Sequence, residues 1–128
     1  MKLFRTVLLM LITAAAHAAF AGEIKPYSKA EFDRLTAQGK PVLIDVYATW
    51  CPTCRAQKPT IDSLMAKPEY KDVTTLVVDY DNDTATLKAY HVRMQSTLIV
   101  FKGKQEQGRS VGDTDPASIE SLVKKAVK

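Results

Sequence analysis

Two sequence patterns meet between Pro41 and Gln57, in the stretch Pro-Val-Leu-Ile-Asp-Val-Tyr-Ala-Thr-Trp-Cys-Pro-Thr-Cys-Arg-Ala-Gln. Residues 42–48 are apolar almost throughout and partly β-branched, which predicts a buried strand. The residues from Cys51 onward predict a helix instead. Cys51 and Cys54 therefore stand at the N-terminus of a helix that directly follows a strand, and this arrangement indicates a redox centre.

The positions of the two cysteines indicate a different chemical role for each. Unpaired N–H groups and the positive end of the helix dipole stabilise a thiolate, which lowers the pKa of Cys51 from its free value of about 8.5. Cys51 is therefore the expected nucleophile. A residue three positions further on lies on the same helix face, so Cys54 is placed to attack a mixed disulfide formed on Cys51. Pro52 suits the first helical turn, because its missing N–H would be unpaired there anyway.

A Cys-x-x-Cys pair is also compatible with a zinc site or with a purely structural disulfide. A structural zinc site needs four Cys or His ligands, whereas the chain has two cysteines and two histidines, one of them in the N-terminal apolar segment. A structural disulfide across so short a loop would constrain the unfolded chain very little. Both alternatives are weaker than a redox pair, and we expect neither a metal nor a bound cofactor.

The N-terminal segment has the features of an export signal. Lys2 and Arg5 precede an apolar run over residues 7–16, and Ala19-Phe20-Ala21 places small residues at the two positions that a signal peptidase recognises. We expect residues 1–21 to be a cleaved signal, with cleavage three residues earlier as the alternative. The run is short for a membrane span of roughly 20 residues, so an uncleaved anchor is less favoured. Export would place the protein in the periplasm, where disulfides form and persist.

Residues 22–128 are enough for one domain with a single core and too few for two. The chain has a formal net charge of +4, but two of its basic residues lie in the predicted signal. The small remaining excess argues against nucleic acid or an anionic membrane surface as a partner. We therefore expect one folded domain, a monomer that binds no nucleic acid.

The rest of the sequence predicts alternating strands and helices. Ser28-Lys29-Ala30-Glu31 is a capping box that predicts a helix over 29–38, and Pro59 predicts a kink in the helix that runs from Cys51 to about Lys67. Asp115-Pro116 begins the last helix. Strands are expected at 24–27, 42–48, 73–80, 97–101 and 107–111, and a further helix follows the turn at 81–83 and ends near 91. The order β α β α β α β β α defines an α/β fold.

The predicted mature chain resembles a thioredoxin along nearly its whole length. The resemblance rests on an acidic residue before the motif, the Trp-Cys-Pro-Thr-Cys motif, a proline inside the next helix, an apolar strand and a Val-Gly pair ten residues beyond it. These features are Asp45, Trp50 to Cys54, Pro59, Thr97 to Phe101 and Val111-Gly112. The resemblance implies the thioredoxin fold, a mixed central β-sheet flanked by helices, and thiol:disulfide oxidoreductase activity.

The resemblance also implies roles for individual residues. Asp45 matches the buried acid that helps to deprotonate the resolving cysteine, so we expect it to act in catalysis with Cys51 and Cys54. Trp50 matches the aromatic residue that shields the disulfide, and Gly112 matches a backbone element beside the site. The residues expected to contact a substrate are Trp50, Pro52, Thr53, Gln95, Ser96 and Gly112.

Three departures from the thioredoxin pattern limit what the resemblance implies. Pro52-Thr53 stands where thioredoxins have Gly-Pro, which is closer to the Cys-Pro-x-Cys of glutaredoxins and disulfide oxidases and leaves the redox potential open. Val77 stands where thioredoxins have a lysine near the buried acid, so desolvation should raise the pKa of Asp45. Ser96 stands where the family has a cis-proline.

Ser96 alters the loop that precedes the strand at 97–101. A cis bond before serine costs about 2.5–4 kcal/mol, against roughly 0.5–1 kcal/mol before proline, so the Gln95–Ser96 peptide is either trans or a strained cis peptide. If it is cis, Ser96→Pro should stabilise the fold. The Ser96 hydroxyl is a candidate to hydrogen-bond the Cys51 thiolate or to lend an oxygen to a bound metal.

These features predict an exported thiol:disulfide oxidoreductase that reduces protein disulfides through Cys51 and Cys54. Reduction is favoured over oxidation because Thr53 adds no cation to stabilise the thiolate. The alternatives are a disulfide oxidase and a binding protein that keeps the fold and carries a metal, an iron–sulfur cluster or an unfolded client, to which Ser96 points. The implied partners are disulfide-containing exported proteins and a transmembrane reductant of the DsbD or CcdA kind.

Overall fold

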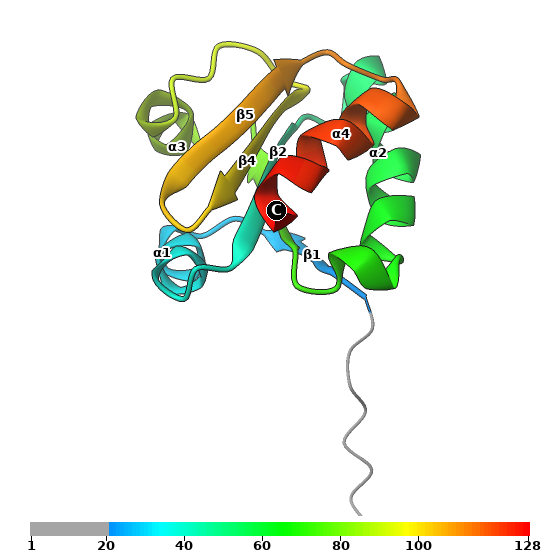
Figure 1. Cartoon of the computed structure of the whole chain (residues 1–128). Coiled ribbons are helices and arrows are strands. Elements are labelled where there is room, and N and C mark those ends of the chain that lie inside the picture. The colour runs from blue at the N-terminus through cyan, green and yellow to red at the C-terminus, as the bar shows by residue number, and fades with distance from the viewer. Residues whose placement is uncertain (1–20) are drawn as a thin grey trace, which may run out of the picture.

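The computed structural model describes residues 21–128, which form a five-stranded mixed sheet with helices packed on both of its faces (Figure 1). The predicted signal lies outside these residues except for its last position, Ala21. Within the described range, no helix is long and apolar enough to cross a membrane.

Strands and helices alternate along residues 21–128 in the predicted order. The strands are β1 (Glu23–Pro26), β2 (Pro41–Tyr47), β3 (Thr74–Asp79), β4 (Thr97–Lys102) and β5 (Gln105–Val111). The helices are α1 (Lys29–Ala37), α2 (Pro52–Met65), α3 (Thr84–Ala89) and α4 (Pro116–Val127), with a 3-10 turn, η1, at Pro68–Tyr70. α3 ends before the predicted position, because Tyr90 caps it and His91 takes a left-handed φ of 55°.

Polar side chains cap the helices where the sequence predicts them. Ser28 Oγ accepts a hydrogen bond from the Glu31 amide (3.1 Å), and the Asp115 carboxylate accepts one from the Ser118 amide (2.9 Å). Each cap satisfies an N–H group that the start of a helix leaves unpaired. α2 continues through Pro59 and gives way to η1 at Pro68.

The strand order β1-β3-β2-β4-β5 places β2 at the centre of the sheet. β2 runs parallel to β3 and antiparallel to β4, so it is hydrogen-bonded along both sides. The more polar β5 pairs antiparallel with β4 and forms one edge, as the sequence predicts. Residues 48–51 connect β2 directly to α2, and the central strand therefore carries the start of the cysteine helix.

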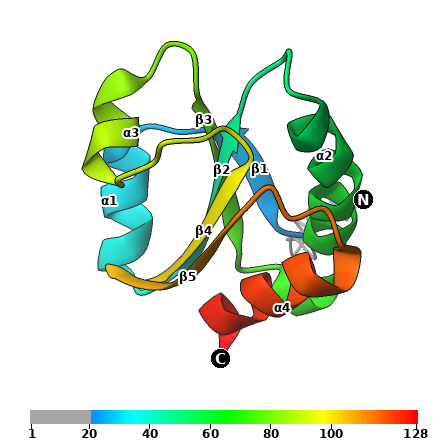
Figure 2. The same ribbon diagram turned by 90° about the horizontal axis from the view of Figure 1, so that it is seen from above.

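Apolar side chains cover both faces of the sheet, because successive strand residues point to opposite sides. Val42, Ile44 and Val46 pack on the side of α1 and α3, whereas Leu43 packs with residues of α2 and α4. Figure 2 shows these two helix pairs on opposite sides of the sheet. Asp45 alternates with the first group, so its carboxyl lies on the α2 side.

Candidate active site

Cys51 is the N-cap of α2, and Pro52 is the first residue of the helix. The Cys51 sulfur accepts a hydrogen bond from the Cys54 amide (3.1 Å), one of the N–H groups that the start of a helix leaves free. The Cys51 amide donates to the Ala48 carbonyl oxygen (3.1 Å), which closes the turn between strand and helix. The predicted nucleophile therefore lies at the positive end of the helix dipole.

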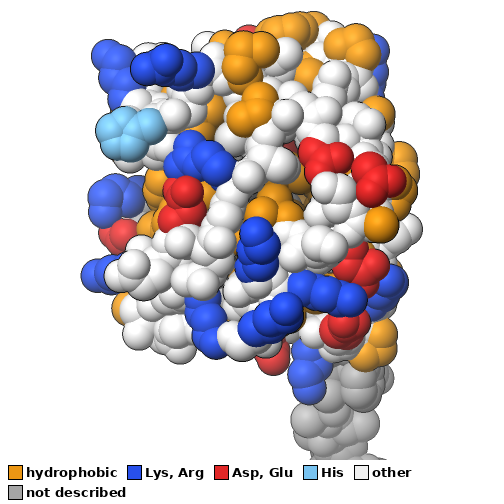
Figure 3. Space-filling view, turned by 45° about the horizontal axis from the view of Figure 1, so that its top comes forward, with side chains coloured by type: hydrophobic (Ala, Val, Ile, Leu, Met, Phe, Trp, Pro, Cys, Tyr) orange, Lys and Arg blue, Asp and Glu red, His pale blue; other side chains and the backbone are white. Residues whose placement is uncertain are grey.

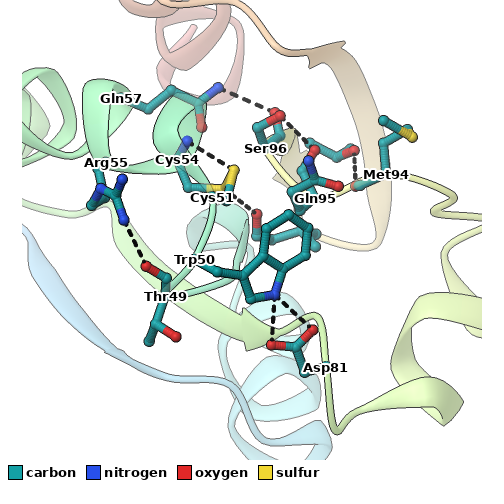
Figure 4. The surroundings of a disulfide bond; sticks show 12 residues. Thr49, Trp50, Cys51, Cys54, Arg55, Gln57, Asp81, Met94, Gln95 and Ser96 are labelled. Carbon is teal, nitrogen blue, oxygen red and sulfur yellow. Dashed lines mark hydrogen bonds between the residues drawn. A yellow bond between two sulfur atoms is a disulfide. The ribbon is translucent and has the colours of Figure 1, made fainter.

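Cys51 and Cys54 form a disulfide, with their Cα atoms 5.3 Å apart (Figure 4). Both residues are buried, and they pack against Ala48 and the ring of Tyr80. Cys54 Sγ also lies 3.8 Å from the Val46 carbonyl oxygen near the end of β2. The two sulfurs are therefore close enough for the pair to alternate between a disulfide and two thiols.

Trp50 is held beside the disulfide by side chains that follow β3. Its indole Nε1 donates to both carboxylate oxygens of Asp81 (3.1 and 3.0 Å), and its ring packs edge-on against Tyr80, with the ring centroids 6.3 Å apart. The sequence indicates only a turn residue at Asp81, because a contact across 31 positions leaves no local pattern. The contact orients Trp50 while leaving it 52% exposed.

Asp45 is buried in the centre of the sheet, where it pairs with Val77 of β3 and Leu98 of β4. Its Oδ1 has no hydrogen-bond partner among residues 21–128. Burial disfavours the carboxylate and raises the pKa of Asp45 to about 6, although Lys58 opposes this shift. The pKa of Asp45 is therefore shifted upward, as expected from the presence of Val77 where thioredoxins have a lysine.

Asp45 lines a pocket of about 170 Å³ together with Lys58 and Asp62 of α2. Lys58 Nζ lies 2.7 Å from an Asp62 carboxylate oxygen, and both side chains are about half exposed. The pocket therefore reaches the surface, and the buried carboxyl can exchange a proton with solvent there. The sequence comparison with thioredoxins places no lysine near Asp45, but the fold supplies Lys58 from α2.

Ser96 has a trans peptide bond and a left-handed φ of 60°, and no cis peptide occurs between residues 21 and 128. Its N–H donates to the Val46 carbonyl oxygen (2.8 Å), and its carbonyl oxygen accepts the Gly112 amide (3.1 Å). Its hydroxyl donates to the Gln95 carbonyl oxygen, so the suggested hydrogen bond to Cys51 is not made in the disulfide form. Because the Gln95–Ser96 peptide is trans, the stabilisation of the fold that Ser96→Pro would give to a cis peptide is not expected.

The described part of the chain contains no grouped set of side chains that could bind a metal ion or iron–sulfur cluster. No three His, Cys, Asp or Glu side chains of residues 21–128 are grouped to hold an ion. The two cysteine sulfurs bond to each other, and the Ser96 hydroxyl donates to its own backbone. In the disulfide form, residues 21–128 therefore present no grouped ligand set at Ser96.

Substitutions at Ser96 should show that its backbone conformation is under strain. Ser96→Gly should raise the free energy of unfolding by up to about 1 kcal/mol, because glycine adopts a positive φ without a steric cost. Ser96→Pro should lower it by about 2 kcal/mol, because proline fixes φ near −65° and removes the N–H that donates to Val46. Urea unfolding of the oxidised proteins measures both effects. A Ser96→Pro protein more stable than the parent would contradict the left-handed trans backbone.

The residues predicted to contact a substrate come from three segments that the fold brings together. Trp50, Pro52 and Thr53 lie at the start of α2, and Gln95 and Ser96 lie in the loop before β4. Gly112, with φ 73°, follows β5 and reaches Ser96 through its amide.

Gln57 belongs to the same region, although the sequence interpretation missed it. Its side chain is buried, and its amide Nε2 donates to the carbonyl oxygens of Ser96 (3.1 Å) and Asp113 (2.8 Å). The available signal was a polar residue three positions after Cys54, on the helix face that packs inward.

Known proteins with similar sequences are thioredoxins. The thioredoxin family model matches residues 23–125. The chain is 40% identical over 84 residues to a thioredoxin of Chlamydia trachomatis, a match that covers 66% of this chain and 80% of the relative. It is 33% identical over 97 residues to a thioredoxin of Coprinus comatus, covering 76% of this chain and 91% of the relative.

Solved structures with the same fold agree with the sequence matches. Trxlp from Edwardsiella tarda EIB202 gives a TM-score of 0.77 at 40% identity, covering 79% of this chain and 98% of that one. Malassezia sympodialis thioredoxin gives 0.72 at 25% identity, covering 88% and 99%. The fold and the Cys51–Cys54 pair define a thioredoxin-type thiol:disulfide oxidoreductase. The chain belongs to the thioredoxin family, and the expected α/β thioredoxin fold is confirmed.

Proposed function

We propose that this protein is an exported oxidoreductase that reduces disulfides in other exported proteins. The observation that carries the proposal is the position of Cys51 at the N-cap of α2, where its sulfur accepts the Cys54 amide hydrogen bond. The same N–H group would stabilise the thiolate that attacks a client disulfide.

The reaction would proceed in two exchange steps. In the first, the Cys51 thiolate attacks a client sulfur, the client S–S bond breaks, and one client sulfur leaves as a thiolate that takes a proton. In the second, Cys54 loses its proton and attacks the Cys51 sulfur of the mixed disulfide. The Cys51–Cys54 disulfide forms, the second client thiol is released, and the client gains two electrons in all. Asp45, with its raised pKa, is the proposed acceptor of the Cys54 proton.

An exposed apolar surface around the disulfide supports a protein client. Trp50, Met94 and Val111 are each at least half exposed and belong to the three segments that meet at the disulfide. Figure 3 shows hydrophobic side chains gathered along the top of the molecule, the end at which α2 begins. Such exposed apolar groups favour contact with a polypeptide over contact with a small polar disulfide.

The residues between and beside the cysteines support reduction as the direction of exchange. DsbA is a strong oxidant because its reduced form is stabilised. Here Thr53 adds no cation between the cysteines, and the nearby Arg55 guanidinium donates to the Thr49 carbonyl oxygen (3.0 Å). A thiolate stabilised mainly by the helix start makes the reduced form less stable than that of DsbA, so the dithiol is a better electron donor than DsbA.

Export is proposed on the N-terminal sequence, namely the basic residues, the short apolar run and Ala19-Phe20-Ala21. Gly22, the first residue of the proposed mature chain, donates its amide to the Met65 carbonyl oxygen (2.7 Å). An exported dithiol needs an electron supply, for which we propose a transmembrane reductant of the DsbD or CcdA kind.

Mass spectrometry of the protein in the periplasmic fraction tests the location. A protein that retains residues 1–21 would contradict cleavage.

The reduction potential of the Cys51–Cys54 pair tests the direction of exchange. We expect a value nearer to about −270 mV, typical of thioredoxins, than to about −120 mV, that of DsbA, when the pair is equilibrated with dithiothreitol buffers. Insulin reduction with dithiothreitol as electron source should be catalysed. Thr53→His is the matched comparison, because the added cation should stabilise the thiolate and make the potential less negative. A parent value near that of DsbA would make the protein an oxidase.

A further inference from the structure

Gln57 is a fully buried polar residue that the exchange reaction itself does not use. Glutamine is usually a surface residue, yet none of the Gln57 surface is exposed. It follows Cys54 by three positions on α2, so it lies on the same helix face as the resolving cysteine. Its two amide N–H groups both have partners, the carbonyl oxygens of Ser96 and Asp113. One side chain thus joins the cysteine helix to the loop before β4 and to the segment after β5, and Figure 4 shows its contact with Ser96.

The Ser96 backbone needs such a restraint. A positive φ is unfavourable for an L residue, and serine has no ring to restrict the chain. Ser96 is held instead by the hydrogen bond that its N–H donates to the Val46 carbonyl oxygen and by those that its own carbonyl oxygen accepts from Gly112 and Gln57. The Val46 carbonyl oxygen that accepts the Ser96 N–H also lies 3.8 Å from Cys54 Sγ. The Ser96 loop therefore lies directly beside the redox pair, and a displacement of Ser96 would change the surface that a client meets there.

Gln57 also carries a cost that an apolar side chain would avoid. Its Oε1 is buried and has no hydrogen-bond partner among residues 21–128. A buried oxygen without a partner loses its hydration without compensation, and methionine would fill a similar space at no such cost. The two N–H contacts are therefore the feature that accounts for an amide at this position.

We propose that Gln57 is a positioning residue that holds the Ser96 and Asp113 carbonyls and so keeps the Gln95–Ser96 loop in one orientation beside the disulfide during client binding. The effect of Gln57 on clients rests on the proposed reductase function, whereas its effect on the loop follows from the hydrogen bonds alone. A separate measurement tests each effect.

Amide hydrogen exchange tests the hold on the loop. Gln57→Met keeps the length of the side chain and removes both N–H donors. The Ser96 and Gly112 amides should then exchange about tenfold faster than in the parent, as expected when one or two net hydrogen bonds are lost. Ile119→Val, a core substitution in α4, controls for a general loss of stability. Protection at both amides no lower than in Ile119→Val would overturn the proposal.

Steady-state kinetics test the effect on clients. For Gln57→Met the KM for insulin should rise about threefold to tenfold with kcat nearly unchanged. Dithiothreitol should reduce the Cys51–Cys54 disulfide of this variant at the same rate as that of the parent. Equal losses with insulin and dithiothreitol would overturn a positioning role. If the parent does not reduce insulin, the reductase proposal fails, and hydrogen exchange alone decides the role of Gln57.

Gln57→Glu keeps the shape of the side chain without the amide donors. It replaces Gln57→Met in both measurements if Gln57→Met does not fold.

Discussion

Cys54→Ser should convert the protein into a trap that accumulates mixed disulfides with its clients, whereas Cys51→Ser should lower turnover to the uncatalysed background. The difference follows from the positions of the two sulfurs. Cys51 Sγ accepts the Cys54 amide at the helix start, while Cys54 Sγ lies against the Val46 carbonyl oxygen. Attack by Cys51 therefore survives in Cys54→Ser, but the step that releases the client does not.

Trapping is measured by non-reducing electrophoresis and mass spectrometry of the protein after incubation with a disulfide-containing client. The adducts should disappear on addition of dithiothreitol. Each variant is the control for the other, because both remove the same disulfide and leave one thiol. Equal trapping by the two variants would contradict the assignment of Cys51 as the nucleophile.

Asp45→Asn should slow the release of the reduced client by about a hundredfold, the lower end of what a positioned general base contributes. The initial attack by Cys51 should change much less, because only the second step requires Cys54 to lose its proton. Single-turnover kinetics separate the two steps. Asp62→Asn is the matched control, since Asp62 lines the same pocket without being buried. Unchanged release in Asp45→Asn would remove Asp45 from the reaction.

The same substitution should change how stability depends on pH. Asp45 has a pKa raised from 3.8 to about 6, chiefly by burial, so the folded protein keeps this proton over a range in which the unfolded chain has lost it. Stability of the parent relative to Asp45→Asn should therefore fall as pH rises from about 4 to about 6, by about 3 kcal/mol in total. Below this range both states are protonated, and above it the difference is constant. Urea unfolding of the oxidised proteins across this range measures it, and parallel pH profiles would contradict a raised pKa.

Local patterns were enough to predict the order of the elements and the position of the redox pair. The alternation from an apolar strand to a helix at Cys51 is visible within a few residues, as are the caps at Ser28 and Asp115. Helix starts depend on hydrogen bonds between residues three positions apart, and strand burial depends on the side chains of the strand itself. The end of α3 was misplaced because His91 leaves the helix through a left-handed backbone, which its side chain does not signal.

The surroundings of the disulfide depend on contacts between distant parts of the chain. Asp81 meets Trp50 across 31 positions, and Gln57 meets Ser96 across 39 and Asp113 across 56. Local sequence patterns do not predict these contacts, because the contacts follow from the strand order that places β3 and β4 on either side of β2.

The sequence by itself therefore determined the α/β class, the place of Cys51 and Cys54 at a helix start, and the direction of the Asp45 pKa shift that an apolar Val77 implies. The tertiary structure alone decided that Ser96 is trans with a positive φ, that Gln57 holds its carbonyl, and that Lys58 faces the buried acid from α2. The physical reason is the range of the interactions. Propensities, caps and burial act within one turn or one strand, whereas a strained loop and a buried carboxyl take their conformation and charge from whichever elements the folded sheet brings against them.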